Sequence, residues 1–440
     1  MIRLIDLIAQ NAAQYPDKTA AVYNGEHLSY ADLLGKIDAE SAAIMRSDGY
    51  AKGSGIVVKN TQNADFIVRY FAIHKAGCVA VPVEKDIPEA RLEQITRIVA
   101  AENFSDEIAD VLFTTGTTGM SKGVMISHRT IIANAENLID AQGFAHDVTF
   151  VVNGPLNHIG SLSKIYPTLL VGGTLYIIDG MKDMNVFFKA FDYPSEKMAT
   201  FLVPASIRML VQFSSRQLSA IAHKIDFVET GAAPISQADM EKLCALLPNS
   251  RLYNTYASTE TGIIATHNYN SDVCVAGCLG KAMKHSKFFI TDEGSVACSG
   301  DTLMSGYIGD SEMTARVMRN GVIYTADCGR IDECGRLHLT GRADDIINVG
   351  GFKVSPSEVE DAAMAFDGIA DCICIAAQHP VLGTVTKLLY VAPDGCEIDL
   401  KALASFLKSK LEAYKVPMFY SREEKIQRTY NGKLNRKYYL

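Results

Sequence analysis

Short apolar runs of strand type alternate along this chain with longer patterns of helical period. SGIVVKN and GCVAVPV have the length and composition of buried strands. SHRTIIANAENLIDAQG is typical of a helix in which Ser127 is the N-cap and Gly143 marks the end. GAAPISQADMEKLCALLP repeats the pattern, with Ser236 and Asp239 spaced as a capping pair. Strands that alternate with helices predict an α/β fold with mostly parallel sheets.

Composition narrows the class of protein. The 440 residues predict two or three domains, and a hydrophobic content of 48% with 21% charged residues is typical of a globular chain. A net charge of −8 argues against nucleic-acid binding. The ten cysteines include no CxxC pair and no zinc-type spacing. Without a signal-peptide pattern or an apolar run long enough to span a membrane, we expect a cytoplasmic protein with no membrane span.

Charge is unevenly distributed along the chain. Residues 401–440 contain ten Lys or Arg against three Asp or Glu. A basic segment on an acidic chain suits a ligand that carries phosphates, and it is equally typical of a solvated helical face.

The sequence changes character after about residue 340. In GRLHLTGRADDIINVGGFKVSPSEVE a charged RADD segment separates two strand-type runs and predicts a hinge. A helix should follow, with Ser355 as N-cap, Pro356 at its first position and Glu358 closing a capping box. We therefore predict one domain over residues 1–343 and a second over residues 344–440.

The segment FTTGTTGMSKGV is the least ordinary part of the chain. It follows a strand-type run and combines hydroxyl donors, glycines that let a backbone approach a ligand, and one cation, Lys122. These groups suit a polyphosphate. The spacing is neither GxxxxGK[ST] nor GxGxxG, and a flexible polar surface loop remains the alternative.

This segment resembles the signature loop of the adenylate-forming (AMP-binding) superfamily, whose members include acyl- and aryl-CoA synthetases. Further motifs follow in the family's order: PLNHIGS, VETGAAPIS, NTYASTETG, YTADCGRIDECGRLHLTGRADDIINVGGFKVSPSEVE and QRTYNGKLNRK. The resemblance implies a large N-terminal domain that binds ATP and an acid, with parallel-rich sheets and packed helices. It also implies a small, mobile α+β C-terminal lid that carries a catalytic lysine.

The resemblance assigns roles to individual residues. Lys433 would bridge the substrate carboxylate and the α-phosphate, Glu260 would hold Mg²⁺, and His158 would gate the acyl pocket, so these three form the expected catalytic set. Asp327 and Arg342 would fix the ribose. The residues expected around ATP are Thr114, Thr115, Gly116, Thr117, Thr118, Lys122, Gly231, Ala232, Ala233, Tyr256, Thr259, Asp327, Arg342 and Lys433.

The same comparison places an acyl pocket and a thiol channel. The pocket would be lined by Asn157, His158, Thr255 and Ala257. Asp344 would be the hinge, and rotation of the lid would bring the channel residues Gly350, Gly351 and Lys353 to the site for attack by a phosphopantetheine thiol. Lys415 is a further candidate contact for an anionic thiol carrier.

Three features of the sequence bear on function, and two of them, the replaced glycines and a trimmed segment, depart from the family pattern. Thr255 and Ala257 replace glycines, which predicts a reshaped pocket for an acid larger than acetate and shorter than a long fatty chain. PLNHIGS lacks the Asp that binds an α-amino group, which argues against amino-acid substrates. Between residue 100 and the Thr/Gly loop the chain lacks a segment that relatives usually carry, so we expect a trimmed N-terminal subdomain.

Three functions remain open at this stage. The chain would activate a small to medium or aryl carboxylic acid with ATP and transfer it to CoA. Alternatively, it would load the phosphopantetheine of an acyl carrier protein, or it would be a non-catalytic binding protein that keeps the fold. The expected cofactors and partners are ATP, Mg²⁺, CoA or carrier-protein phosphopantetheine, and a small carboxylic acid, without nucleic acid.

Overall fold

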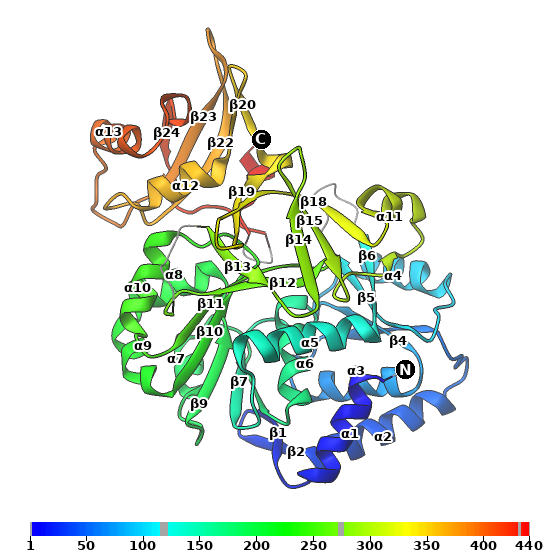
Figure 1. The fold of residues 1–440 in the computed structure, drawn as a ribbon. Helices are drawn as coiled ribbons and strands as arrows, with labels where there is room; N and C mark the ends of the chain where they lie inside the picture. The colour runs from blue at the N-terminus through cyan, green and yellow to red at the C-terminus, as the bar shows by residue number, and fades with distance from the viewer. Residues whose placement is uncertain (1, 115–121, 272–276, 430–432, 440) are drawn as a thin grey trace.

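The computed structural model describes residues 2–114, 122–271, 277–429 and 433–439. A large α/β body contains two sheets, and a smaller C-terminal unit stands above it (Figure 1). In the part of the chain that the structure describes, no helix has both the length and the apolar character needed to cross a membrane.

One half of the largest sheet is parallel and alternates with helices, as predicted. Its order is β11-β10-β9-β7-β8-β1, and β2 pairs antiparallel with β1 at the edge. The strands are β1 (Thr19–Tyr23), β2 (Glu26–Ser29), β7 (Val148–Val152), β8 (Thr174–Ile177), β9 (Lys197–Phe201), β10 (Ile225–Thr230) and β11 (Arg251–Ser258). The helices of this region are α1 (Leu4–Gln14), α5 (His128–Gln142), α6 (Ile159–Leu170), α7 (Met184–Ala190), α8 (Pro204–Phe213), α9 (Ser215–Ile221) and α10 (Gln237–Leu246).

Beyond β11 the same sheet becomes antiparallel. The order continues β12-β13-β19-β18-β15-β14, with β17 paired to β18. These strands are β12 (Gly262–Asn268), β13 (Cys278–Ala282), β14 (Ser286–Ile290), β15 (Ser295–Gly300), β17 (Met318–Arg319), β18 (Val322–Ile331) and β19 (Leu337–Arg342). Short connections replace crossover helices here, with α11 (Ser311–Val317) as the one α-helix among the described residues between β12 and β19.

The second sheet carries the Thr/Gly loop. Its order is β16-β6-β5-β4-β3, and β3 (Gly55–Lys59), β4 (Val79–Val83) and β5 (Ile108–Thr114) are parallel. β6 (Lys122–Ser127) returns antiparallel to β5, and β16 (Gly306–Tyr307) pairs with β6. The loop is therefore the connection of a hairpin and not a strand-to-helix turn. The helices of this region are α2 (Tyr30–Arg46), α3 (Ala64–Lys75) and α4 (Glu89–Ala100).

The connection between α4 and β5 is short. Residues 101–107 alone join these two elements. This brevity agrees with the predicted trimming of the N-terminal subdomain.

A buried polar cluster fixes β5 ahead of the loop. Asp110 on β5 is fully buried and accepts hydrogen bonds from the Tyr70 hydroxyl (2.7 Å) and His74 Nε2 (2.9 Å), both on α3. Tyr166 of α6 lies 2.9 Å from the Tyr70 hydroxyl. The cluster joins the second sheet to the helix layer of the first.

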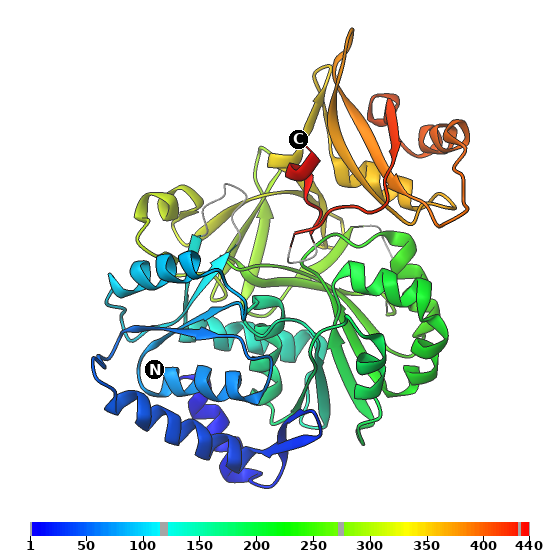
Figure 2. The ribbon, with the colours of Figure 1, turned by 180° about the vertical axis from the view of Figure 1, so that it is seen from behind.

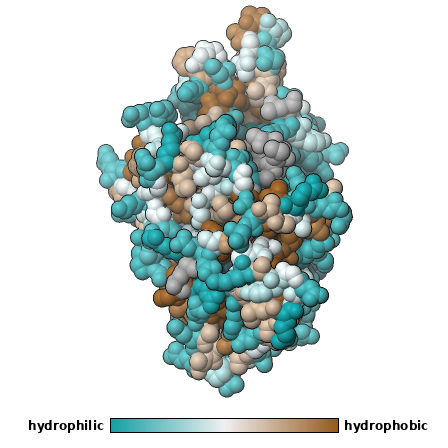
Figure 3. Space-filling model, turned by 90° about the vertical axis from the view of Figure 1, so that its right-hand side faces the viewer, coloured by the Kyte–Doolittle hydropathy of each residue, from teal (hydrophilic) through white to brown (hydrophobic). Residues whose placement is uncertain are grey.

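The C-terminal unit projects from the body (Figure 2) and has a hydrophobic core of its own, built from residues between 347 and 416. Its elements are β20 (Ile347–Val349), β21 (Phe352–Val354), α12 (Pro356–Met364), β22 (Asp371–His379), β23 (Gly383–Val391), α13 (Leu400–Lys410) and β24 (Phe419–Arg422). The tip of the β22–β23 hairpin, at the top of Figure 3, is apolar: Val381 and Leu382 are 84% and 55% exposed. A separate core agrees with the two-domain division, while the boundary at residue 343 stays a prediction.

Helix termini test the sequence patterns directly. α5 begins after Ser127, whose hydroxyl accepts from the Thr130 N–H, and it ends at Gly143 in the left-handed conformation (φ +70°), as predicted. α12 begins after Ser355, but the predicted capping box is wrong, because the Ser355 side chain makes no capping bond. Glu358 pairs instead with Lys415, which also binds Glu412.

Candidate active site

Asp327 and Arg342 form a cross-strand pair where the large sheet meets the C-terminal unit. They are register partners on β18 and β19, and the Arg342 guanidinium lies 3.3 Å from Asp327 Oδ1. The buried Tyr256 donates its hydroxyl to Asp327 Oδ2 at 2.7 Å. Burial, followed by the Asp327 charge, raises the pKa of Tyr256. Both carboxylate oxygens of Asp327 are thus held in place, Oδ1 by Arg342 and Oδ2 by Tyr256.

Glu260 lies in the turn between β11 and β12 and contacts a residue that the sequence patterns do not identify. The hydroxyl of Tyr307 on β16 donates to Glu260 Oε1 at 3.0 Å. Lys122, the first residue of β6, places Nζ 5.4 Å from the centre of the Tyr307 ring. Tyr307 therefore connects the base of the Thr/Gly loop to the predicted metal ligand.

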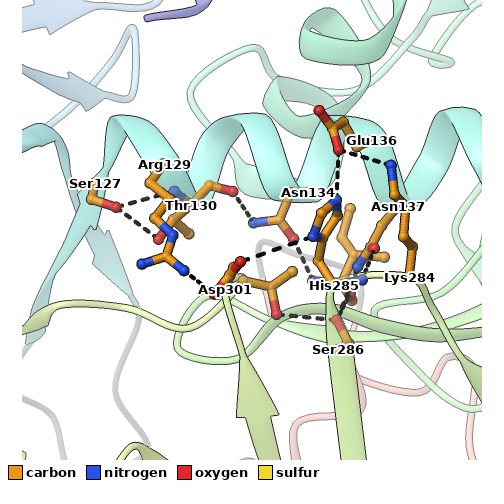
Figure 4. Close-up of polar contacts among 12 residues, drawn as sticks. Ser127, Arg129, Thr130, Asn134, Glu136, Asn137, Lys284, His285, Ser286 and Asp301 are labelled. Atoms are coloured by element: carbon orange, nitrogen blue, oxygen red, sulfur yellow. Dashed lines mark hydrogen bonds and ion pairs between the residues drawn. The ribbon is translucent and has the colours of Figure 1, made fainter. Parts of the chain in front are cut away.

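Polar side chains of α5 reach the neighbouring antiparallel strands (Figure 4), among them β12, which follows the turn that carries Glu260. Asn134 accepts from the Ile263 N–H at 2.7 Å, and Asn137 donates to the Ile263 carbonyl at 2.9 Å. Thr130 donates to the Leu303 carbonyl at 3.0 Å. The Met304 N–H in turn donates to the Glu260 carbonyl at 2.8 Å. α5 thus holds both segments, and a satisfied buried network of this kind restricts how far the Glu260 turn can move.

Charged residues surround this network at the surface. Glu136 accepts from His285 Nε2 at 2.6 Å and from Lys284 at 3.1 Å. Arg129 binds Asp301 at 2.5 Å (Figure 4). These pairs connect α5 to the antiparallel strands and lie outside the Glu260 turn.

Lys433 of the C-terminal unit lies near charged residues of the body. The Thr429 N–H donates to the Lys433 carbonyl at 2.8 Å, and Arg428 bridges to Leu434, which closes a turn around residue 433. Lys433 is an exposed residue, although neighbouring protein atoms partly desolvate its ammonium group. Desolvation and the nearby Arg342 lower the pKa of Lys433, whereas Asp327 and Glu260 raise it. The structure therefore brings together Lys433, Arg342, Asp327 and Glu260.

The hinge and channel residues occupy a different position. Asp344 Oδ2 lies 3.9 Å from Arg342 Nη2, so the predicted hinge adjoins the site. Gly350, Gly351 and Lys353 are exposed, and an added Cβ at either glycine would meet no atom within 4 Å. Lys433 therefore lies near Arg342, Asp327 and Glu260, and the Gly-Gly loop faces open space.

On the acyl side, His158 is the N-cap residue of α6 and lies 4.0 Å from Glu84. Burial lowers the pKa of His158, and the Glu84 charge partly offsets this effect. Gly231 has no room for a side chain, because a Cβ would lie 2.9 Å from the Thr255 carbonyl oxygen. Ala232 is exposed and adopts φ +67°, a conformation that is unfavourable for a residue with a Cβ. A strained loop at a cleft is typical of a ligand site.

Thr255 and Ala257 are not equivalent, although their spacing suggests one face of a strand. Thr255 is buried, and its hydroxyl bonds to Gln142 (3.1 Å) and Thr266 (2.9 Å). The ladder of β11 is irregular between Tyr256 and Ala257, and Ala257 is exposed. The side chain of Thr255 thus points into the interior and Ala257 reaches the surface.

Several predicted ligands of ATP lie outside the described residues, namely Thr115, Gly116, Thr117 and Thr118. Thr114 and Lys122, which flank them, are register partners at the ends of β5 and β6. Thr259 shares the turn of Glu260, and Ala233 follows Ala232 in the loop after β10. Gly123 serves packing, because a Cβ there would lie 2.5 Å from the Ile308 side chain.

Comparison with known proteins identifies the family. Residues 8–104 and 98–308 match the AMP-binding enzyme family, and residues 358–433 match the AMP-binding enzyme C-terminal domain. The chain belongs to the AMP-binding enzymes. The match of this AMP-binding enzyme divides near residue 100, which is where the trimmed segment was predicted.

Relatives of this AMP-binding enzyme include several CoA ligases. A feruloyl-CoA synthase from an Amycolatopsis species is 24% identical over 480 residues, covering 97% of this chain and 96% of that protein. A 3-[(3aS,4S,7aS)-7a-methyl-1,5-dioxo-octahydro-1H-inden-4-yl]propanoyl:CoA ligase from Rhodococcus jostii is 28% identical over 353 residues, covering 79% and 67%. The fold matches ATP-bound MatB from Rhodopseudomonas palustris with a TM-score of 0.89 at 22% identity, over 100% of this chain and 99% of that one.

The side chains of this AMP-binding enzyme could hold a metal ion only together with oxygen atoms from phosphates or water. Within residues 2–114, 122–271, 277–429 and 433–439, no group of three or more His, Cys, Asp or Glu side chains could hold a metal ion. Mg²⁺ prefers oxygen ligands and keeps water or phosphate oxygens around it. Glu260 fits as one carboxylate ligand of a metal whose other ligands come from phosphates and water.

Proposed function

We propose that this AMP-binding enzyme is an AMP-forming acid–thiol ligase. It joins a small to medium or aryl carboxylic acid to ATP, releases pyrophosphate, and passes the acyl group from the acyl-adenylate to the thiol of CoA with release of AMP. The proximity of charged residues from distant parts of the chain carries this proposal: Arg342 lies 3.3 Å from Asp327, and Lys433 is close enough to Arg342, Asp327 and Glu260 to feel their charges. The CoA-ligase relatives support the choice of acceptor.

The residues divide the chemistry of the first step among them. An anionic carboxylate must approach an anionic phosphate, so a cation between them stabilises the charge that develops on the bridging oxygens. Lys433 is the residue placed to do this. Burial and Arg342 lower the pKa of Lys433, and anionic ligands beside its ammonium group would raise that pKa again.

Other residues orient the nucleotide. The Asp327 carboxylate, held by Tyr256 and Arg342, would accept hydrogen bonds from the ribose hydroxyls. Lys122 would neutralise the departing phosphates. Mg²⁺, where bound at Glu260, supplies charge neutralisation of the phosphate oxygens; Tyr307 orients that carboxylate.

The second step requires the lid to turn. Gly350, Gly351 and Lys353 would then face the site and admit the pantetheine thiol. The exposed position of these residues agrees with a lid that occupies its first position here. Lys415 is occupied by Glu358 and Glu412, so it is a weaker candidate for a contact with CoA than the exposed Lys353.

The test is ATP-dependent pyrophosphate release over a panel of carboxylic acids, with and without CoA. We expect several acids to release pyrophosphate and the matching acyl-CoA to form with free CoA. An adenylate that reacts with a phosphopantetheinylated carrier protein and not with CoA would select the carrier-loading alternative. Absence of pyrophosphate release with every acid would refute the proposed activity.

A further inference from the structure

A lysine and a glutamate form an ion pair inside the body, next to the expected acyl pocket. Lys164 of α6 places Nζ 2.7 Å from Glu229 of β10, and the two side chains are 3% and 1% exposed. Removing two charges from water costs several kcal/mol per ion, and apolar residues of similar size are often as stable or more stable at such positions. A buried pair at this location is therefore a candidate for a functional role.

The surrounding contacts connect this pair, through Phe201, to glycines beside the expected acyl pocket. Phe201 and Glu229 are register partners on the parallel strands β9 and β10, so their side chains project to the same face of the sheet. Lys164 Nζ lies 5.3 Å from the centre of the Phe201 ring. Phe201 also approaches Gly160 and Gly231, since an added Cβ at these glycines would lie 3.5 and 3.8 Å from its ring.

Distance along α6 sets the reach of a substrate. Lys164 is six residues beyond His158, which corresponds to about 9 Å along a helix axis. This is roughly the length of an arylpropanoate or a six- to eight-carbon acid. An acid that reacts near His158 and Gly231 would thus place its far end at Phe201 and the ion pair.

Unsatisfied acceptors indicate the chemistry of that far end. Among the described residues, Asn157 Oδ1 is buried without a hydrogen-bond partner, while both carboxylate oxygens of Glu229 lie 2.7 Å from the same Lys164 ammonium group. A carboxylate can accept up to about four hydrogen bonds. The pair itself is neutral overall, so an added carboxylate or ammonium would be an uncompensated buried charge.

We propose that Lys164 and Glu229, behind Phe201, select an acid with an uncharged hydroxyl at its far end. The hydroxyl would donate to Glu229 and accept from Lys164 once the ring of the half-buried Phe201 moves aside. This inference rests on the proposed ligase activity and names its substrate class.

The experiment compares matched acids on the full-length enzyme. The pairs are 3-(4-hydroxyphenyl)propanoate with 3-phenylpropanoate, and 6-hydroxyhexanoate with hexanoate, with hexanedioate as the charged competitor. We expect kcat/KM for pyrophosphate release to favour the hydroxylated member of at least one pair by about 10- to 100-fold, and to disfavour hexanedioate. Equal rates within each pair, or a preference for hexanedioate, would overturn the proposal without affecting the ligase activity.

Variants identify the residues responsible. Lys164→Met combined with Glu229→Leu removes both charges together and should reduce the hydroxyl preference to within about threefold. The matched control is Arg251→Met with Asp226→Leu. This double variant removes a 2.6 Å ion pair at the N-terminal ends of β10 and β11, away from Glu229, and should leave the preference intact. A double variant at 164 and 229 that keeps the wild-type ranking would show that the pair is purely structural. Should it not fold, the wild-type comparison of matched acids still decides the proposal.

Discussion

One ion pair joins the lid to the body in the position where Lys433 faces the cleft. Asp371, the first residue of β22, binds Arg208 of α8 at 2.6 Å, and Arg208 also binds Asp239 of the body at 3.0 Å. Figure 1 shows the lid helix α12 above α8 and α10 at this contact. Asp371→Asn removes the charge on the lid side. Arg208 keeps Asp239 as a partner, so the body retains no uncompensated buried charge.

The size of the effect follows from burial. The Arg208 and Asp371 side chains are 15% and 22% exposed, which places the pair between surface and core. A hydrogen bond to a charged group contributes about 1.5–3 kcal/mol, and partial exposure reduces this to about 1–2 kcal/mol. Since 1.4 kcal/mol is a factor of ten in an equilibrium, the population of the adenylate-forming lid position should fall about 5- to 30-fold relative to other positions.

The two half-reactions separate this effect from a general loss of stability. ATP–pyrophosphate exchange measures the first, and thioester formation from a synthetic acyl-adenylate with CoA measures the second. We expect Asp371→Asn to slow exchange about 3- to 15-fold when the two lid positions are near balance, and to leave the second rate unchanged or raised. The control is Asp147→Asn, which removes the exposed 2.7 Å pair with Lys197. Both of these residues belong to the body, so neither half-reaction should change. Equal losses in both half-reactions, or none, would refute the reasoning.

Two further substitutions test the site, and a third tests how a carboxylate of the C-terminal unit affects stability. Lys433→Ala should lower exchange about 100- to 1,000-fold and leave thioester formation from synthetic acyl-adenylate within about threefold; comparable losses in both assays would contradict its assignment to the first step. Tyr307→Phe removes the hydrogen bond to Glu260 and should lower kcat/KM for exchange about 3- to 10-fold, with a higher Mg²⁺ requirement in a titration. Burial, and next the Asp239 charge, raise the pKa of Asp361 to about 7. Its contribution to stability is therefore complete below about pH 4 and is lost as the pH rises through 7, with a slope of at most about 1.4 kcal/mol per pH unit. Denaturant unfolding from pH 4 to 8 should show this slope flattened in Asp361→Asn, and an unchanged slope would show that Asp361 is not its source.

Local patterns predicted those features that depend on neighbours in sequence. The limits of α5 followed from Ser127 and Gly143, since an N-cap hydroxyl and a left-handed C-terminal glycine act within one turn of the helix. At Ser355 the same pattern failed. Lys415, distant in sequence, takes Glu358 into an ion pair and removes it from the helix terminus.

Residues that act through tertiary contact left no trace in the sequence. Tyr307 belongs to no motif and reaches Glu260 only because β16 pairs with β6. Glu229 lies in the quoted VETGAAPIS motif and Lys164 lies three residues beyond PLNHIGS, yet neither segment indicates that the two residues meet. The resemblance assigns both Thr255 and Ala257 to the acyl pocket, and it contains no sign of the irregular ladder of β11 that buries one side chain and exposes the other.

The position of Asp371 explains why one carboxylate should influence Lys433 in particular. Besides Arg208, Asp371 binds Arg428 at 2.8 Å. Arg428 bridges to Leu434 and so closes the turn that presents Lys433. The body, the first strand of the lid sheet and the lysine turn are thus linked through a single side chain. Lys122, Tyr307 and Glu260 belong wholly to the body and keep their contacts wherever the lid lies. Loss of the Asp371 charge should therefore displace Lys433 while the phosphate end of the site stays assembled.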